Sequence, residues 1–222
     1  MAYILSIHSA TETAIVSISD DERVVHSLLN TNTKEHAAFL HVAIRDLLQK
    51  SHLGIKDLQA VAVSYGPGSY TGIRVGIATA KGLCYALGIP LIFLNSLELI
   101  AHSSIQMAAD PGALYCPMID ARRMEVFTAL YNYEMQAVLP PVAMILDASS
   151  FGVQLKSHKI YFSGSGSKKY KDLVGGSNAL FMDGAISGDS LAAISSYKFH
   201  NNEFENIGYA QPLYLKEFYL LR

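Results

Sequence analysis

The segment from Tyr65 to Arg74 constrains the fold of this chain more than any other. Its sequence, YGPGSYTGIR, follows an apolar run at 58–64 that predicts a buried strand, and it leads into a helical pattern that ends near Leu87. Pro67 fixes one backbone angle, and the glycines permit turns or close approaches that other residues cannot make. A buried strand must therefore turn tightly here into a helix, whose first turn a hydroxyl side chain can cap.

Two interpretations of this connection remain open. Backbone N–H groups and a helix N-terminus meet at one point, which suits an anion, but the segment can equally be a packing turn. No Gly-Lys-Ser/Thr follows, which excludes a P-loop, and Thr71 stands where a Rossmann fingerprint has its third glycine. The candidate nucleotide or anion loop consists of Gly66, Gly68, Ser69, Thr71, Gly72 and Arg74.

The pattern of elements is that of an α/β protein with an internal duplication. Each half opens with three consecutive strand-like segments and continues with mixed helices and strands. We expect strands at 3–9, 12–19, 22–30, 58–65, 90–94, 114–119, 124–132, 136–146 and 158–163, with a strand-like tail at 207–222. We expect helices at 34–50, capped by Thr33, at 70–87, ended by Gly88, and at 96–107.

Several segments together resemble the bacterial TsaB (YeaZ) family, which older classification groups with peptidase M22-like glycoproteases. YGPGSYTGIRVGIATAKGLCYALGIPL is similar to the family's GPGSFTGLR signature, and ILSIHSATETAIVSI to its ILAIDTAT-type opening. KEHAAFLHVAIRDLL, MIDARRMEVFTALY, FSGSGSKKY and YAQPLYLKEF resemble further family segments in the same order. The resemblance covers nearly the whole chain.

The resemblance implies an actin-like ATPase (ASKHA) architecture of two ribonuclease-H-like lobes. We expect an N-terminal lobe at 1–110, with the tail at 207–222 packing back onto it, and a smaller C-terminal lobe at 111–206.

The resemblance also implies a function. A TsaB-like chain is a non-catalytic scaffold that supports a TsaD-like catalytic subunit, with a TsaE-like ATPase, in threonylcarbamoyl transfer to N6 of adenosine 37 of tRNA (t6A modification). Such a chain meets tRNA only indirectly, forms a homodimer in some settings, and has ATP or ADP at a subunit interface as its one candidate cofactor. In the family the helices matching 34–50 and 70–87 form the interface, which here points to His36, Leu40, Ile44, Gly72, Gly76 and Ala80.

Glycines in the helix at 70–87 support an interface independently. Gly costs about 1 kcal/mol relative to Ala in a helix interior, so close approach of a neighbour should compensate. That neighbour can lie within the chain or in a partner. Under the partner interpretation, a bulky residue at Gly76 should abolish pairing and leave the fold largely intact.

The alternative is a small ASKHA-type ATPase or kinase that uses the loop from Gly66 to Gly72 for phosphate. His8 argues against it, because the family opening has Asp there and imidazole supplies neither a fixed negative charge nor a hard oxygen ligand for Mg²⁺. No G-x-S-x-G or HExxH occurs, so a peptidase is not supported.

Two polar groups outside the loop are weaker candidates. Glu98 and His102 stand four residues apart on one helix face, but two ligands are too few for a catalytic metal, so we interpret them as a surface pair and predict no metal site. The residues Asp120, Arg122, Arg123 and Glu125 can bind an anion, although a structural ion-pair network is the favoured interpretation.

The composition of the chain limits the kinds of molecule that it is expected to bind. A net charge of −2 at pH 7 and the absence of basic runs disfavour direct binding of nucleic acid. A mean hydropathy of +0.23 is high for a folded globular chain and fits either a well-filled core or an apolar interface. The two cysteines, Cys84 and Cys116, are expected to be buried thiols of a cytoplasmic protein, and the longest apolar region is too interrupted to cross a membrane.

Overall fold

The computed structural model describes residues 2–32 and 36–216, with the backbone only at His36. The chain divides into two compact units, of which the first comprises residues 1–99 and 186–213 and the second comprises 100–185 and 214–222. Thr33 and Lys34, where the first helix was expected to be capped and to begin, lie outside the described residues, as does the tail after Lys216.

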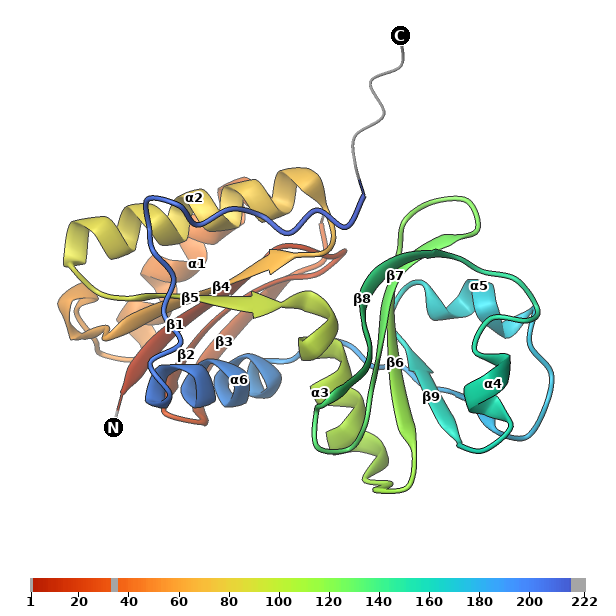
Figure 1. Ribbon diagram of the computed structural model, residues 1–222. Helices are drawn as coiled ribbons and strands as arrows, with labels where there is room; N and C mark the ends of the chain where they lie inside the picture. The colour runs from red at the N-terminus through yellow and green to blue at the C-terminus, as the bar shows by residue number, and fades with distance from the viewer. Residues whose placement is uncertain (1, 33–35, 217–222) are drawn as a thin grey trace, which may run out of the picture. The chain divides into compact units, whose positions relative to one another are not determined.

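A five-stranded mixed sheet forms the centre of the first unit (Figure 1). Its order is β3-β2-β1-β4-β5, in which β1 pairs antiparallel with β2 and parallel with β4. The strands are β1 (Tyr3–His8), β2 (Ala14–Asp20), β3 (Arg23–Asn30), β4 (Ala60–Gly66) and β5 (Leu91–Asn95).

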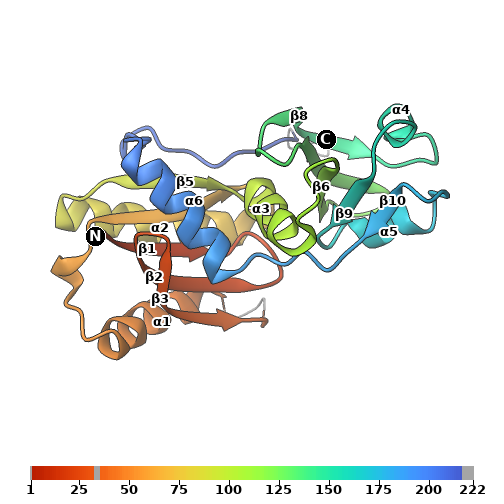
Figure 2. The same ribbon diagram turned by 90° about the horizontal axis from the view of Figure 1, so that it is seen from below.

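Helices cover both faces of this sheet, as Figures 1 and 2 show. On one face lie α1 (His36–Lys50) and α2 (Tyr70–Leu87), and on the other lies α6 (Gly188–His200). A short 3-10 helix, η2 (Ile55–Asp57), precedes β4. Alternation along the strands explains the layering, because Val61 and Val63 of β4 pack under α1 and α2, whereas Ala60 and Ala62 pack with Leu191 of α6.

The second unit repeats the same topology. Its sheet has the order β10-β9-β6-β7-β8, with β6 antiparallel to β7 and parallel to β9. Its strands are β6 (Leu114–Asp120), β7 (Glu125–Tyr131), β8 (Ala137–Ile145), β9 (Ile160–Ser163) and β10 (Ala179–Phe181), and its helices are α4 (Gly152–Leu155) and α5 (Ser167–Lys171). α3 (Ser96–Ala108) follows β5. Two five-stranded sheets with one strand order confirm the predicted duplication and the ASKHA-type fold class.

The end of the chain differs from the sequence-based expectation in two ways. α6 belongs to the first unit, although the expected boundary placed residues 186–206 in the second lobe; its Leu191 packs into the first unit's core. Residues 207–216 form no strand, but the tail does cross the first unit: Glu205 N donates to Leu91 O at 2.8 Å and Leu213 N donates to Tyr65 O at 2.8 Å.

Candidate functional site

The predicted loop connects the end of β4 to the start of α2. The Gly66–Pro67 peptide bond is cis, and Gly66 and Gly68 have φ angles of 124° and 151° that favour glycine. Ser69 is the N-cap of α2 and its hydroxyl accepts a hydrogen bond from Gly72 N at 3.3 Å. The strand-to-helix turn predicted from the sequence is therefore confirmed, with Ser69 as its cap.

The glycines of this loop allow it to pack against the turn between β1 and β2. A Cβ atom on Gly68 would lie 1.9 Å from the carbonyl oxygen of Ala10, and one on Gly72 would lie 1.9 Å from that of Ser9. Hydrogen bonds fix the contact, since Ser69 N donates to Ala10 O at 2.7 Å and Ser9 Oγ donates to Gly72 O at 2.8 Å. Packing within the unit thus accounts for both glycines without a ligand.

Two predicted loop residues point away from this contact. Thr71 and Arg74 are exposed on the first turns of α2, and the Arg74 guanidinium lies 3.8 Å from the centroid of the Tyr70 ring, a cation–π geometry. Binding of an anion by this loop stays a prediction.

His8 is fully buried at the end of β1. Its Nδ1 lies 2.6 Å from Ser64 Oγ and its Nε2 lies 2.9 Å from Thr11 Oγ1. Both ring nitrogens therefore have hydroxyl partners that can accept or donate, which explains how this interior accommodates an imidazole.

The helix residues predicted for the partner interface are mostly buried inside their own unit. Leu40 and Ala80 are fully buried, and Ile44 packs in the same core. A Cβ on Gly76 would lie 2.7 Å from Ser9 Oγ and 3.4 Å from Val63 Cγ2. Gly76 therefore faces the sheet, whereas Gly72 faces the turn between β1 and β2. The expectation that a bulky residue at Gly76 would spare the fold is wrong for a physical reason: the space is filled. The side chain of His36 lies outside the described part of the chain.

The surface between α1 and α2 instead carries a groove of about 520 Å³. Its rim and floor come from both helices and from Ile55 of η2. The lining residues are His41, Ile44, Arg45, Leu48, Ile55, Ala78, Thr79, Gly82 and Leu83. Ile44 is the one predicted interface residue among them, and it forms part of the floor.

Gly82 is the residue of this groove that the chain itself does not explain. It is exposed in the middle of α2, and a Cβ added to it would meet nothing within 4 Å. Because an exposed helix glycine costs about 1 kcal/mol relative to Ala, it is the position at which an external neighbour best accounts for glycine. Helix periodicity could have separated Gly82 from Gly72 and Gly76, since it falls on a different face.

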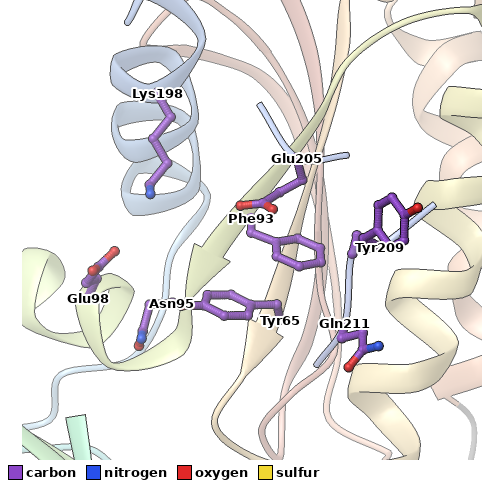
Figure 3. A pocket seen from close by; sticks show the side chains of 9 residues that line it. Tyr65, Phe93, Asn95, Glu98, Lys198, Glu205, Tyr209 and Gln211 are labelled. Atoms are coloured by element: carbon purple, nitrogen blue, oxygen red, sulfur yellow. The ribbon is translucent and has the colours of Figure 1, made fainter. Parts of the chain in front are cut away.

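The two weaker polar candidates also have defined places. Glu98 is partly buried: burial raises the pKa of its carboxyl group, and the residue lines a pocket of about 250 Å³ at the ends of β4 and β5 (Figure 3). Asp120 pairs with Lys169 at 2.7 Å and Glu125 with Lys216 at 2.6 Å. Although burial opposes it, the hydrogen bond from Lys169 contributes to a lowered pKa of Asp120. The two carboxylates thus form ion pairs, as predicted, but among the described residues their partners are lysines from outside the predicted cluster and not Arg122 or Arg123.

Three further findings bear on the sequence predictions. Both cysteines are buried free thiols, as expected, and burial raises their pKa values, to about 11 at Cys84 and about 12 at Cys116. Within residues 2–32 and 36–216, no three side chains of His, Cys, Asp or Glu gather as metal ligands. No helix in that part of the chain is both long and apolar enough to span a membrane.

Known proteins are similar to this chain in both sequence and fold. The model of a family described as "TsaD: tRNA N6-adenosine threonylcarbamoyltransferase" matches residues 30–212. The tRNA threonylcarbamoyladenosine biosynthesis protein TsaB of Escherichia coli (strain K12) is 28% identical over 225 residues, which cover 96% of this chain and 94% of the relative. TsaB of Bacillus subtilis (strain 168) is 29% identical over 174 residues, covering 77% and 74%.

The structural comparison agrees. YeaZ from Pseudomonas aeruginosa superposes with a TM-score of 0.80 at 22% identity, covering 97% of this chain and 100% of the other, which establishes a shared fold. The family model matches most of the chain, and the two five-stranded sheets have the strand order of the ASKHA fold. The chain therefore belongs to the TsaB/YeaZ family within the wider TsaD family.

Proposed function

We propose that this chain is a non-catalytic partner subunit of a TsaD-like enzyme in the t6A modification of tRNA. The relatives are named for threonylcarbamoyladenosine biosynthesis, and we assign this chain a supporting role in that reaction. In this role the chain supplies a binding interface, and the partner subunit supplies the catalytic residues. The observation that carries it is the exposed Gly82 in an apolar groove between α1 and α2, a glycine for which no contact within residues 2–32 and 36–216 accounts.

The chemistry of the groove suits a helix from another protein. Ile44, Leu48, Ile55 and Leu83 contribute apolar surface, while Ala78 and Gly82 keep the α2 side low, so that a second backbone can approach closely. His41 and Arg45 supply polar groups on the α1 side. An apolar centre with a polar edge is the usual composition of a protein interface.

Tyr85 extends the same surface. It follows Gly82 by three residues, which places both on one side of α2, and its side chain is 84% exposed. A large, stiff aromatic ring gains much area when a partner covers it and loses little conformational entropy, which is why tyrosine is enriched at interfaces.

The surroundings of the predicted phosphate loop favour a role without catalysis. The loop glycines pack on Ser9 and Ala10, and the position of the family aspartate holds His8, buried between two hydroxyl groups. The net charge of −2 disfavours contact with the phosphates of tRNA, so we assign tRNA binding to other subunits. A TsaE-like ATPase would join the assembly through other surfaces.

The test is a binding and activity comparison of three forms of the chain. Gly82→Arg places bulk and charge in the groove, and we expect it to weaken pairing with the organism's TsaD-like subunit by about tenfold or more and to lower t6A formation in the reconstituted reaction. Gly175→Arg is the matched control, because Gly175 is exposed and a Cβ there also meets nothing within 4 Å.

Neither variant should unfold at a lower temperature than the wild type, since neither site is packed, and Gly82→Arg should gain some stability because arginine has a higher helix propensity than glycine. Equal affinity of wild type and Gly82→Arg would refute the proposed interface. A homodimer that competes with the TsaD-like subunit for the groove would appear as a wild-type dimer that Gly82→Arg dissociates.

A further inference from the structure

A second concave site lies in the first unit and shares no lining residue with the α1–α2 groove. It is a pocket of about 250 Å³ bounded by the ends of β4 and β5, the start of α3, the end of α6 and the tail. Figure 3 shows Lys198 and Glu98 on one side of it and Tyr209 and Gln211 on the other.

The pocket exists because the tail leaves the edge of the sheet. Glu205 bridges Leu91 of the edge strand β5 in antiparallel fashion, and Leu213 later bonds to Tyr65. Between these two points the tail forms a turn, in which Tyr209 N and Ala210 N both donate to Asn206 O. A stretch of the β5 edge is therefore left without a neighbouring strand.

That stretch presents the peptide groups of Phe93. Strand residues direct their N–H and C=O groups alternately to the two edges, and the C=O of Leu91 points to the tail. Phe93, two residues on, therefore directs its peptide groups to the same edge, beside the pocket that it lines. No described residue outside the sheet forms a backbone hydrogen bond with Phe93 N or O. An edge peptide group can pair with an amide of a ligand.

The pocket lining has more acidic than basic side chains, which favours a cationic ligand. Its lining contains two carboxylates, Glu98 and Glu205, and one ammonium, that of Lys198, which already pairs with Glu203 at 3.3 Å. Burial raises the pKa of the Glu98 carboxyl group because it removes water from it. The charge of Lys198 lowers this pKa, and that of Glu203 raises it. A positive group brought into the pocket would replace that lost water as the partner of the carboxylate.

Aromatic rings complete the site. Tyr65 and Phe93 stack with centroids 4.8 Å apart and planes at 7°, which makes one rigid wall. Tyr209 stands at the opposite side with 83% of its side chain exposed. Ring faces attract ammonium groups, and the combination of carboxylates with rings is suited to an organic cation more than to a bare metal ion.

We propose that this pocket binds a small primary-ammonium compound that carries an adjacent amide group. The carboxylates of Glu98 and Glu205 would attract the ammonium group, and the amide would pair with the free edge of Phe93. The site is independent of the proposed scaffold function, because the interface groove lies elsewhere on the unit.

The test is an NMR titration of the full-length chain with two probes of similar size. Glycinamide has the ammonium group and the amide, whereas acetamide has the amide alone. We expect glycinamide to produce saturable shifts of the amide signals of Phe93, Glu98 and Tyr209, and acetamide to bind at least about tenfold more weakly.

Variants locate the binding. Glu98→Gln and Glu205→Gln should each weaken glycinamide binding by about tenfold. Glu22→Gln removes the same charge from an exposed position of the unit outside the pocket lining and should leave binding unchanged. Should Glu98→Gln fold poorly, Glu205→Gln provides the same test from the tail. Non-saturable shifts, equal binding of the two probes, or unchanged affinity in both pocket variants would overturn the proposal.

Discussion

The contact between the glycine loop and the β1–β2 turn makes a sharp prediction about Gly72. In Gly72→Ala the new Cβ would lie 1.9 Å from the carbonyl oxygen of Ser9 and 3.0 Å from its carbonyl carbon. Non-bonded carbon and oxygen rarely approach within about 3 Å, so the two segments must separate by about 1 Å. Both atoms that block the Cβ belong to the backbone, and no side-chain rotation relieves the contact.

The magnitude combines opposing effects. Overpacking of this kind costs about 1–3 kcal/mol, and loss of the hydrogen bonds at Ser9 and Ser69 costs about 1 kcal/mol each. Alanine regains about 1 kcal/mol of helix propensity. We expect a net loss of about 2–4 kcal/mol in the free energy of unfolding, which for a chain of this size lowers the unfolding temperature by about 4–16 °C.

Gly82→Ala is the matched control in the same helix. Its Cβ would meet nothing within 4 Å, so only the propensity gain remains, and the unfolding temperature should rise by about 2–4 °C. The assay is thermal unfolding followed by circular dichroism on both variants and the wild type. Gly72→Ala with wild-type or higher stability would refute the packing explanation of the loop.

Two further predictions concern buried titratable groups. Because burial raises the pKa of Cys84 to about 11 and that of Cys116 to about 12, neither thiol should react with iodoacetamide at pH 8 until the protein unfolds; mass spectrometry of native samples that shows rapid labelling would contradict this. Burial raises the pKa of Glu98 above its ordinary 4.5, so its ionisation costs stability as pH rises through the folded-state value. Glu98→Gln cannot ionise, and its free energy of unfolding relative to wild type should therefore increase between about pH 4 and pH 8 in urea titrations, whereas a constant difference would refute the burial argument.

The arrangement of strands and main helices was accessible from the sequence because it depends on local signals. The alternation of apolar and polar residues indicated the strands, and Ser69 and Gly88 indicated where α2 begins and ends. The repeat of three strands in each half of the chain indicated two sheets. Gly88 has the left-handed φ of 67° that a helix-ending glycine adopts, and its N–H donates to Cys84 O at 2.9 Å.

The assignment of helix faces was less accessible, because a small residue has the same appearance in the sequence whether it meets its own sheet or a partner. A Cβ on Gly72 or Gly76 would meet Ser9, whereas a Cβ on Gly82 would meet no atom of the described residues within 4 Å. The pocket at Glu98 could not be predicted either, since it requires Lys198 and Glu205, about 100 residues later, to return to the edge of β5.

The most direct test of the scaffold role is the mass of the species that this 24.2 kDa chain forms with the TsaD-like subunit of the same organism. Light scattering on the purified mixture, with and without ATP, measures it. We predict a stable complex with the summed mass of one copy of each subunit, which Gly82→Arg dissociates. Two separate species under every nucleotide condition would contradict the proposed function, and ATP turnover by the isolated chain would then favour the enzymatic alternative.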